Sequence, residues 1–504
     1  MKKSNSPFNL VSELLGRHAA ERGEKTAIYF EDTTVDYRTL MANINRFANV
    51  LAELKIKPKE RVLLLLPDSP LFVYAFLGSI KYGACPVPVN TMLREEDYKY
   101  LLEDSEAAVL VTTKDSPAAR VRTSRLHYKL FADNGLMSML STVSDAADAY
   151  AAREDDVAFW LYSSGSTGRP KGVPHRHIDM IHAADSYGKG VLNVTEDDIV
   201  YSVSKLFFAY GLGNGIGIPF RTGASVVLSP EKPTPEGVVS TVSRYRPTVF
   251  FGVPTQYNSV LKKLRDDSAF ASVRTCVSAG EALPPEVFNR WKERTGLEIL
   301  DGIGSTEALH IFISNFPNDT RPGTSGRVVP GYEAKIVDEE GNEVPSGEAG
   351  HLIIRGESVT KGYWNRPEEN QEKILEGGWF RTGDMYSQQD GYFRYQGRGD
   401  DMLKVGGIWV SPIEIENVLI QHRAVQEVAV VGHNVEGLSK PFAYVSVNDE
   451  YSTQGPKGSD GLSEELLSFV SERLPRFKWL HGVYIVEELP KTATGKIQRF
   501  KLRK

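Results

Sequence analysis

The chain has 504 residues, of which 41% are hydrophobic and 25% charged, as in a soluble globular protein, and its length predicts two or more domains. Its net charge of −6 leaves no broad basic surface, which argues against a nucleic-acid partner. Cys85 and Cys276 cannot build a disulfide framework, and neither a signal peptide nor an apolar stretch of membrane-spanning length is found. We therefore expect a cytoplasmic protein without a membrane partner.

The first two thirds of the chain alternate apolar strands with amphipathic helices, which predicts parallel sheets covered on both faces. Strands are expected at residues 61–67, 86–89, 107–113, 199–203, 225–228, 248–253 and 274–277. Helices are expected at residues 36–56, 70–82, 235–245, 255–266 and 284–295. Residues 117–150 lack a regular pattern and are expected to be mostly irregular.

From about residue 325 the sequence becomes rich in strands and turns, with a hairpin expected over 335–344 and a strand over 351–355. The polar, glycine-bearing stretch 397–401 predicts a domain boundary, with a hinge at Asp400. Beyond it we expect helices at 412–421 and 462–473 and strands at 426–432, 442–447 and 483–486.

The pattern as a whole predicts an α/β fold in two domains. Residues 1–399 are expected to form a large N-terminal domain of packed α/β sheets, which includes a β-rich subdomain at about 325–399. Residues 400–504 are expected to form a small α+β C-terminal domain.

Residues 162–172 (YSSGSTGRPKG) carry the densest group of phosphate-binding residue types in the chain. Glycines let backbone N–H groups converge on an anion, and the hydroxyls of Ser163, Ser166 and Thr167 add uncharged donors. Lys171 adds a point charge suited to phosphate. The alternative is a flexible polar linker. The spacing is not that of a Walker A loop.

Residues 301–307 (DGIGSTE) follow a strand expected at 298–300, and loops at the carboxyl ends of parallel strands bind ligands in open α/β sheets. Glu307 offers a carboxylate for Mg²⁺, or else an acidic residue at a helix N-terminus. Residues 278–283 (SAGEAL) end another strand, where small side chains let a flat base approach the backbone. Their alternative is an ordinary strand-to-helix turn.

These two segments and the loop at 162–172, with residues 379–384 (WFRTGD) and 490–496 (PKTATGK), resemble in order and spacing the motifs of the acyl-adenylate-forming (ANL) superfamily. The resemblance covers most of the chain and implies ATP, Mg²⁺ and coenzyme A as cofactors. It implies that ATP or AMP contacts Ser163, Ser164, Gly165, Ser166, Thr167, Gly168, Lys171, Ser278, Ala279, Gly280, Glu281, Asp301, Gly302, Ile303, Asp384 and Arg398.

The same resemblance implies three catalytic residues. Thr306 contacts the α-phosphate, Glu307 binds Mg²⁺, and Lys496 stabilises the charge that develops as the substrate carboxylate attacks phosphorus. It also implies a C-terminal domain that rotates about Asp400. The rotation brings residues 406–407 to the site, where Gly406 and Gly407 leave a tunnel for the pantetheine arm of CoA.

Residues 205–214 (KLFFAYGLGN) and 301–312 resemble segments of benzoate-CoA ligases and of their hydroxy- and aminobenzoate relatives. An aryl-acid pocket is therefore expected from Phe208, Ala209, Tyr210, Gly304, His310 and Ile311. The alternative for these aromatic side chains is core packing. His175, His177 and His182 suggest a metal site, although surface or structural roles are better expectations for three histidines in this setting.

The resemblance implies an AMP-forming acid–thiol ligase that converts an aryl carboxylic acid, such as benzoate or a hydroxy- or aminobenzoate, to its CoA thioester through an aryl-AMP intermediate. It also implies a homodimer. An enzyme that loads the acid onto the phosphopantetheine of a carrier protein would share every motif. A non-catalytic nucleotide-binding protein would be expected to lack Lys496 or Glu307, and both are present.

Overall fold

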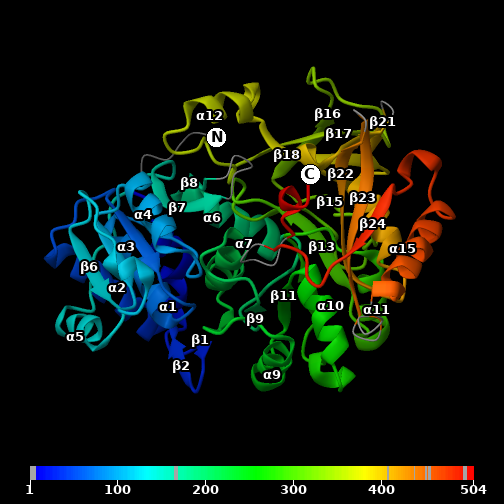
Figure 1. Ribbon diagram of the computed structural model, residues 1–504. Coiled ribbons are helices and arrows are strands. Elements are labelled where there is room, and N and C mark those ends of the chain that lie inside the picture. Colours follow the sequence, from blue (N-terminus) through cyan, green and yellow to red (C-terminus); the bar gives the residue numbers. More distant parts are fainter. Residues whose placement is uncertain are drawn as a thin grey trace.

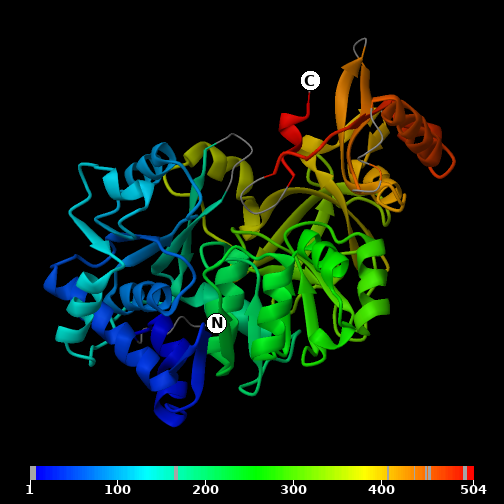
Figure 2. The same cartoon turned by 60° about the horizontal axis from the view of Figure 1, so that its bottom comes forward.

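The computed structural model describes residues 7–163, 169–405, 408–435, 438–448, 451, 456–491 and 497–503. Figure 1 shows the start of the chain, in blue and cyan, on the left, the green part in the middle, and the orange C-terminal strands with α15 on the right. In the turned view of Figure 2 these C-terminal elements stand above the green and yellow parts. The expected α/β fold, with a large N-terminal and a small C-terminal part, is confirmed. The boundary at residue 400 stays a prediction.

The first sheet is parallel throughout and is built by the N-terminal part of the chain. Its strands, in spatial order, are β4 (Cys85–Pro88), β3 (Arg61–Leu65), β5 (Val109–Thr112) and β6 (Tyr128–Phe131). Its helices are α2 (Tyr37–Glu53), α3 (Pro70–Tyr82), α4 (Glu95–Asp104) and α5 (Asn134–Thr142). Helix α3 begins where the Ser69 hydroxyl accepts from the Phe72 N–H, and it ends at Gly83, whose φ of 95° is readily available only to glycine.

Residues 117–150 are irregular over much of their length, as expected, but β6 and α5 lie within them and were not predicted. Strand β6 buries only Leu130 and exposes Tyr128, so it lacks the continuous apolar run from which its neighbours were predicted. Its pairing with β5 decides its conformation. Helix α5 buries only Leu136 and Leu140, and Asp133 caps it by accepting from Gly135 N–H.

The second sheet has nine strands and occupies the middle of the molecule. Its order is β15 (Arg327–Val328), β14 (Ile311–Ser314), β13 (Ile299–Gly304), β12 (Thr275–Ser278), β11 (Val249–Gly252), β9 (Ile199–Ser202), β10 (Ser225–Leu228), β1 (Thr26–Phe30) and β2 (Thr33–Asp36). The strands from β13 to β1 are parallel, and both edges are antiparallel. The first strand of the chain thus completes the sheet, because Ile28 pairs with Val226.

Helices connect the strands of this sheet, and the predicted ones at 235–245, 255–266 and 284–295 are present. The helices of the region are α1 (Arg17–Glu21), α6 (His177–Ala183), α7 (Ala209–Leu212), α8 (Ile218–Thr222), α9 (Pro235–Tyr245), α10 (Pro254–Lys263) and α11 (Pro285–Thr295). A two-stranded hairpin, β7 (Val157–Ser163) with β8 (Lys171–Arg176), joins the two sheets in sequence. Cys85 and Cys276 are buried, unpaired thiols in β4 and β12.

The β-rich region forms an antiparallel sheet of β16 (Tyr332–Val337), β17 (Ala349–Gly356), β18 (Phe380–Gln389) and β19 (Tyr392–Arg398), with α12 (Pro367–Lys373) between β17 and β18. The hairpin expected over 335–344 is reduced to a single bridge between Val337 and Glu343. The main partner of β16 is β17. The residues after β16 form a local turn, in which the Asp338 carboxylate accepts from the Asn342 N–H, and they do not extend the strand pairing.

The C-terminal elements have a core of their own. They are β20 (Leu403–Val405), β21 (Ile408–Val410), α13 (Pro412–Leu419), β22 (Val425–Val435), β23 (Leu438–Val447), α15 (Pro456–Ser471) and β24 (Gly482–Ile485). Strands β22 and β23 pair antiparallel, and β24 joins β23 in parallel. Across the part of the chain that the structure describes, no helix combines the length and hydropathy needed to cross a bilayer.

Candidate active site

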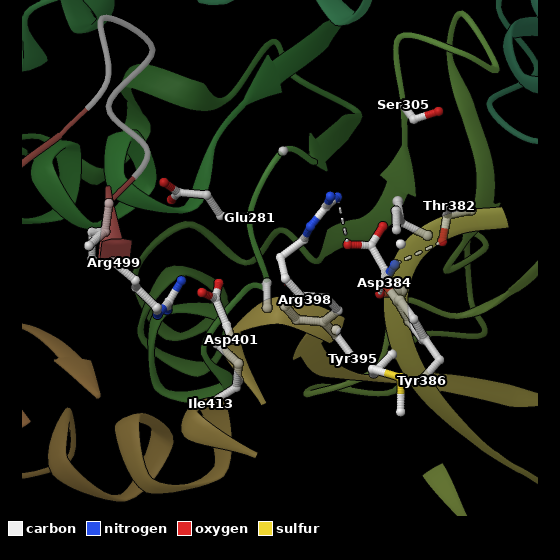
Figure 3. A pocket seen from close by; sticks show the side chains of 18 of the residues that line it. Glu281, Ser305, Thr382, Asp384, Tyr386, Tyr395, Arg398, Asp401, Ile413 and Arg499 are labelled. Carbon is white, nitrogen blue, oxygen red and sulfur yellow. Dashed lines mark hydrogen bonds and ion pairs between the residues drawn. The ribbon is translucent and has the colours of Figure 1, made fainter. Parts of the chain in front are cut away.

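A cavity of about 770 Å³ lies where the carboxyl ends of β12 and β13 meet β18, β19 and the C-terminal elements. Its walls come from stretches spread over residues 163–499, which the fold brings together. The predicted site residues that line it are Ser163, Lys171, Gly280, Glu281, Gly302, Ile303, Gly304, Thr306, Glu307, Asp384 and Arg398. Figure 3 shows Glu281, Asp384 and Arg398 around this space, with Asp401 and Arg499 on the side of the C-terminal elements.

Several predicted residues lie outside the described residues, namely Ser164, Gly165, Ser166, Thr167, Gly168, Gly406, Gly407 and Lys496. Their roles stay predictions, as does the hinge at Asp400. Their described neighbours nevertheless lie at the cavity. Ser163 and Lys171 face each other across the β7–β8 hairpin and both line it, as does Ile497.

Tyr363 links the two charged groups expected to meet the phosphates, and sequence reasoning missed it. Its hydroxyl donates to Glu307 Oε1 at 2.9 Å, and the Lys171 ammonium lies 5.5 Å from its ring centre. Burial and the Glu307 carboxylate raise the pKa of Tyr363. Lys171 also pairs with Glu369 of α12 at 3.3 Å. An incoming anion would therefore compete with Glu369 for Lys171.

Thr306 lines the cavity, and its backbone is contacted from behind by a buried polar network. His175 is buried in β8, and its Nε2 lies 2.8 Å from the Thr306 carbonyl oxygen, while its Nδ1 lies 3.4 Å from Asp179. The Leu10 N–H donates to His177 Nδ1, and burial lowers the pKa of His177 to about 4. Structural roles fit both histidines, and among the described residues no group of three or more His, Cys, Asp and Glu side chains is placed to hold a metal.

Two of the predicted ATP or AMP contacts, Asp384 and Arg398, lie opposite each other on neighbouring strands. Asp384 of β18 stands opposite Arg398 of β19, and the Arg398 Nη1 to Asp384 Oδ1 distance is 3.3 Å. Gly383 has a φ of 84°, and a side chain there would point at the Arg398 guanidinium. The Asp384 N–H donates to Thr382 Oγ1 at 3.1 Å, which fixes the turn. A carboxylate so held can accept from two vicinal hydroxyls.

Asp301 lies in the buried part of β13, and one of its carboxyl oxygens, Oδ1, has no hydrogen-bond partner among the described residues. Burial raises its pKa well above the usual value for an aspartate. Such an orphaned buried oxygen is costly unless a ligand or water satisfies it. The position at the strand ends agrees with the predicted nucleotide contact, which stays a prediction.

The predicted aryl-acid residues lie together, beside the cavity. Phe208, Ala209 and Tyr210 stand at the start of α7, and the His310 ring lies 5.9 Å from that of Tyr210. Gly304 lines the cavity, whereas the others are absent from its wall. Ile311 is 1% exposed and belongs to the core of the second sheet, as core packing would require. Their binding role stays a prediction.

His310 is locked in a neutral form. The Asn214 side-chain N–H donates to Ser202 Oγ, so Asn214 Oδ1 faces His310 Nε2 at 2.9 Å and accepts a hydrogen bond from the N–H at that position. Complete burial lowers the pKa of His310 to about 3. A Cβ on Gly213 would lie 2.2 Å from His310 Cδ2, so no other residue fits there without movement.

This pKa predicts a pH dependence of stability. In the unfolded chain His310 protonates near pH 6.5, but in the folded protein only near pH 3, so its contribution is complete above 6.5 and is lost as the pH falls toward 3. We expect His310→Gln to reduce the slope of unfolding free energy against pH by up to about 1.4 kcal/mol per unit in that window. Denaturation at pH 7 to 4 would measure it, and parallel curves for variant and wild type would contradict it.

Comparisons with known proteins show the family of the chain. Residues 15–364 match the family model described as AMP-binding enzyme, and residues 414–496 match that of the AMP-binding enzyme C-terminal domain. A benzoate–CoA ligase of Thauera aromatica is 44% identical, over 98% of this chain and 96% of that protein. A 4-hydroxybenzoate–CoA/benzoate–CoA ligase of Rhodopseudomonas palustris is 38% identical, over 98% and 94%.

Among solved structures, that of a benzoate CoA ligase from Burkholderia xenovorans LB400 superposes with a TM-score of 0.91 at 41% identity, covering 99% of this chain and 100% of that one. The likeness extends through both the N-terminal and the C-terminal parts, so it covers every motif described above. The cavity, the order of the motifs and these matches lead to one conclusion: the chain belongs to the family of AMP-binding enzymes, within the acyl-adenylate-forming superfamily.

Proposed function

We propose that this enzyme is an aryl-acid:CoA ligase that acts on benzoate or a hydroxy- or aminobenzoate. The observation that carries the proposal is the position of Gly304. It lines the nucleotide cavity, and a Cβ added to it would lie 2.6 Å from the carbonyl oxygen of His310, which belongs to the predicted aryl-acid residues. An aryl carboxylate held there would have its carboxyl group directed to the α-phosphate of ATP. The names of the two relatives above support the same chemistry.

The reaction has two steps. In the first, a carboxylate oxygen attacks the α-phosphorus of ATP, the bond between the α-phosphorus and the bridging oxygen breaks, and pyrophosphate leaves. In the second, the CoA thiol, having lost its proton, attacks the carbonyl carbon, and AMP leaves. No covalent bond to the enzyme is needed, so positioning and electrostatics carry the catalysis.

The residues divide this work. Ser163 and Lys171, with the serine and threonine of the loop between them, would hold the departing pyrophosphate, and Thr306 would contact the α-phosphate. Asp384 and Arg398 would hold the ribose. Lys496 would stabilise the charge of the first transition state.

Glu307 fits the role of Mg²⁺ ligand. It is a half-buried carboxylate on the cavity wall, and its Oε1 is oriented by the Tyr363 hydroxyl. Mg²⁺ is usually held by one or two carboxylates together with phosphate oxygens and water. When bound, the ion would neutralise part of the phosphate charge.

The test is pyrophosphate release with ATP and Mg²⁺ for benzoate, its hydroxy and amino derivatives, cinnamate, acetate and a medium-chain acid, each with and without CoA. We expect turnover only with benzoates, accelerated by CoA. Turnover of the aliphatic acids alone would contradict the assigned acid. Adenylate formation without CoA-dependent release would instead indicate a carrier protein as acceptor.

We also propose that the enzyme is a cytoplasmic homodimer. The buried, unpaired thiols of Cys85 and Cys276 support a reducing compartment. Light scattering of the purified protein at micromolar concentration would measure the assembly, and a mass of one chain would contradict it.

A further inference from the structure

Asp68 lies between β3 and α3 of the first sheet, yet its carboxyl group contacts the segment that carries the predicted aryl-acid residues. It is 4% exposed, and its Oδ1 accepts from the Leu206 backbone N–H at 3.0 Å. Its Oδ2 lies 3.8 Å from the Lys205 ammonium. The contact joins residues far apart in sequence and connects the first sheet to the second.

Lys205 is itself fixed. Its ammonium donates to the carbonyl oxygens of Ser229 at 2.6 Å and Glu231 at 2.5 Å, just beyond β10. Burial raises the pKa of Asp68 to about 6 and lowers that of Lys205. A buried pair of this kind adds little stability in itself, so position is the better reason for its presence.

The segment that Asp68 contacts is tightly folded. The Phe208 N–H donates to the Lys205 carbonyl at 3.0 Å, and the Leu212 N–H donates to the Phe208 carbonyl at 2.7 Å. A Cβ on Gly211 would lie 2.0 Å from the Lys205 carbonyl oxygen. Because the segment turns back on itself without spare room, a shift at Leu206 would displace Phe208 and Tyr210 together.

We propose that Asp68 is a positioning residue for the aryl-acid pocket. It acts through the Leu206 N–H and Lys205 to fix the start of α7, and it touches neither ATP nor the acid. The inference rests on the proposed function, since it assigns the acid to Phe208 and Tyr210. Asp68 belongs to the first sheet, whereas all the predicted pocket residues belong to the second sheet and its connections. The position of the pocket would thus depend on a residue from a different sheet.

The test compares Asp68→Ala with Asp68→Asn. Alanine leaves a buried N–H without its acceptor and an ammonium without its counter-charge, so we expect the KM for benzoate to rise roughly tenfold while the KM for ATP stays within about twofold. Asparagine keeps an oxygen for Leu206 and should stay within about threefold of wild type. Calorimetric titration of ATP into each variant verifies that it is folded.

Asp198→Ala is the matched control. Asp198 is also buried, at 5% exposed, and is paired with Arg274 and Thr248, but it precedes β9, at the amino end of this strand, whereas Leu206 follows the carboxyl end. It should lower stability without changing the KM for benzoate relative to that for ATP. The inference is overturned if Asp68→Ala changes neither KM or both equally, or if Asp198→Ala gives the same selective rise. A wild-type enzyme inactive on all benzoates would overturn the proposed function instead.

Discussion

Replacing Lys496 with alanine should reduce aryl-adenylate formation by roughly 10²–10³-fold, the scale of losing one donor aimed at a transition-state charge. The charge develops only while the carboxylate attacks phosphorus, so conversion of supplied aryl-adenylate and CoA to thioester should continue at near the wild-type rate. The two half-reactions are measured separately, by pyrophosphate release and by thioester formation.

Lys491→Ala is the control for this prediction. Lys491 and Ile497 form a bridge that flanks residues 492–496, and the Lys491 ammonium pairs with Glu427 at 2.8 Å. A lysine engaged in this way should affect adenylation far less than Lys496. Equal loss of both half-reactions in Lys496→Ala, or a larger loss in Lys491→Ala, would refute the assigned role.

Arg499→Ala should destabilise the C-terminal elements by about 3 kcal/mol, because it leaves a buried carboxylate without its cation. Glu416, on α13, receives Nη2 of Arg499 at 2.8 Å and Nε at 3.2 Å, and its Oε1 also accepts from the Val430 N–H of β22 at 2.7 Å. The pair thus ties the end of the chain to a helix and a strand. Chemical denaturation would measure the loss.

Two further variants make this prediction specific. Arg499→Lys should recover only part of the stability, since an ammonium cannot reproduce the two-point contact of a guanidinium. Arg17→Ala breaks an exposed pair with Glu21 within the N-terminal helical region and should leave the midpoint unchanged. If Arg499→Ala and Arg17→Ala unfold at the same denaturant concentration, the buried pair does not stabilise the fold.

Most strands and helices are predictable because the strands are apolar without interruption and the helices repeat apolar residues at helical spacing. Helix α9 begins and ends where its pattern does, and the motifs can be recognised in the sequence because each is contiguous. The misses have a common cause. Tyr363, Arg499 and Asp68 meet their partners through contacts that cross the chain, and their local sequence gives no sign of that.

The aromatic segment shows where pattern reading stops. Residues 205–214 can be assigned by resemblance. The tautomer of His310, however, is fixed by a hydrogen bond to Asn214, and this bond joins the residues just after α7 to the residue just before β14. Similarly, residues 128–131 form strand β6 because their backbone pairs with that of β5. Both depend on partners that a linear sequence does not identify.

The pairing of β1 with β10 has a consequence for biosynthesis. Ile28 leaves the ribosome long before Val226, its partner in the sheet. At about 5–20 residues per second, β1 waits on the order of tens of seconds with one edge uncovered, joined only to β2. Nascent chains arrested before β10 should therefore aggregate or bind chaperones through this hairpin, whereas chains arrested after β10 should not.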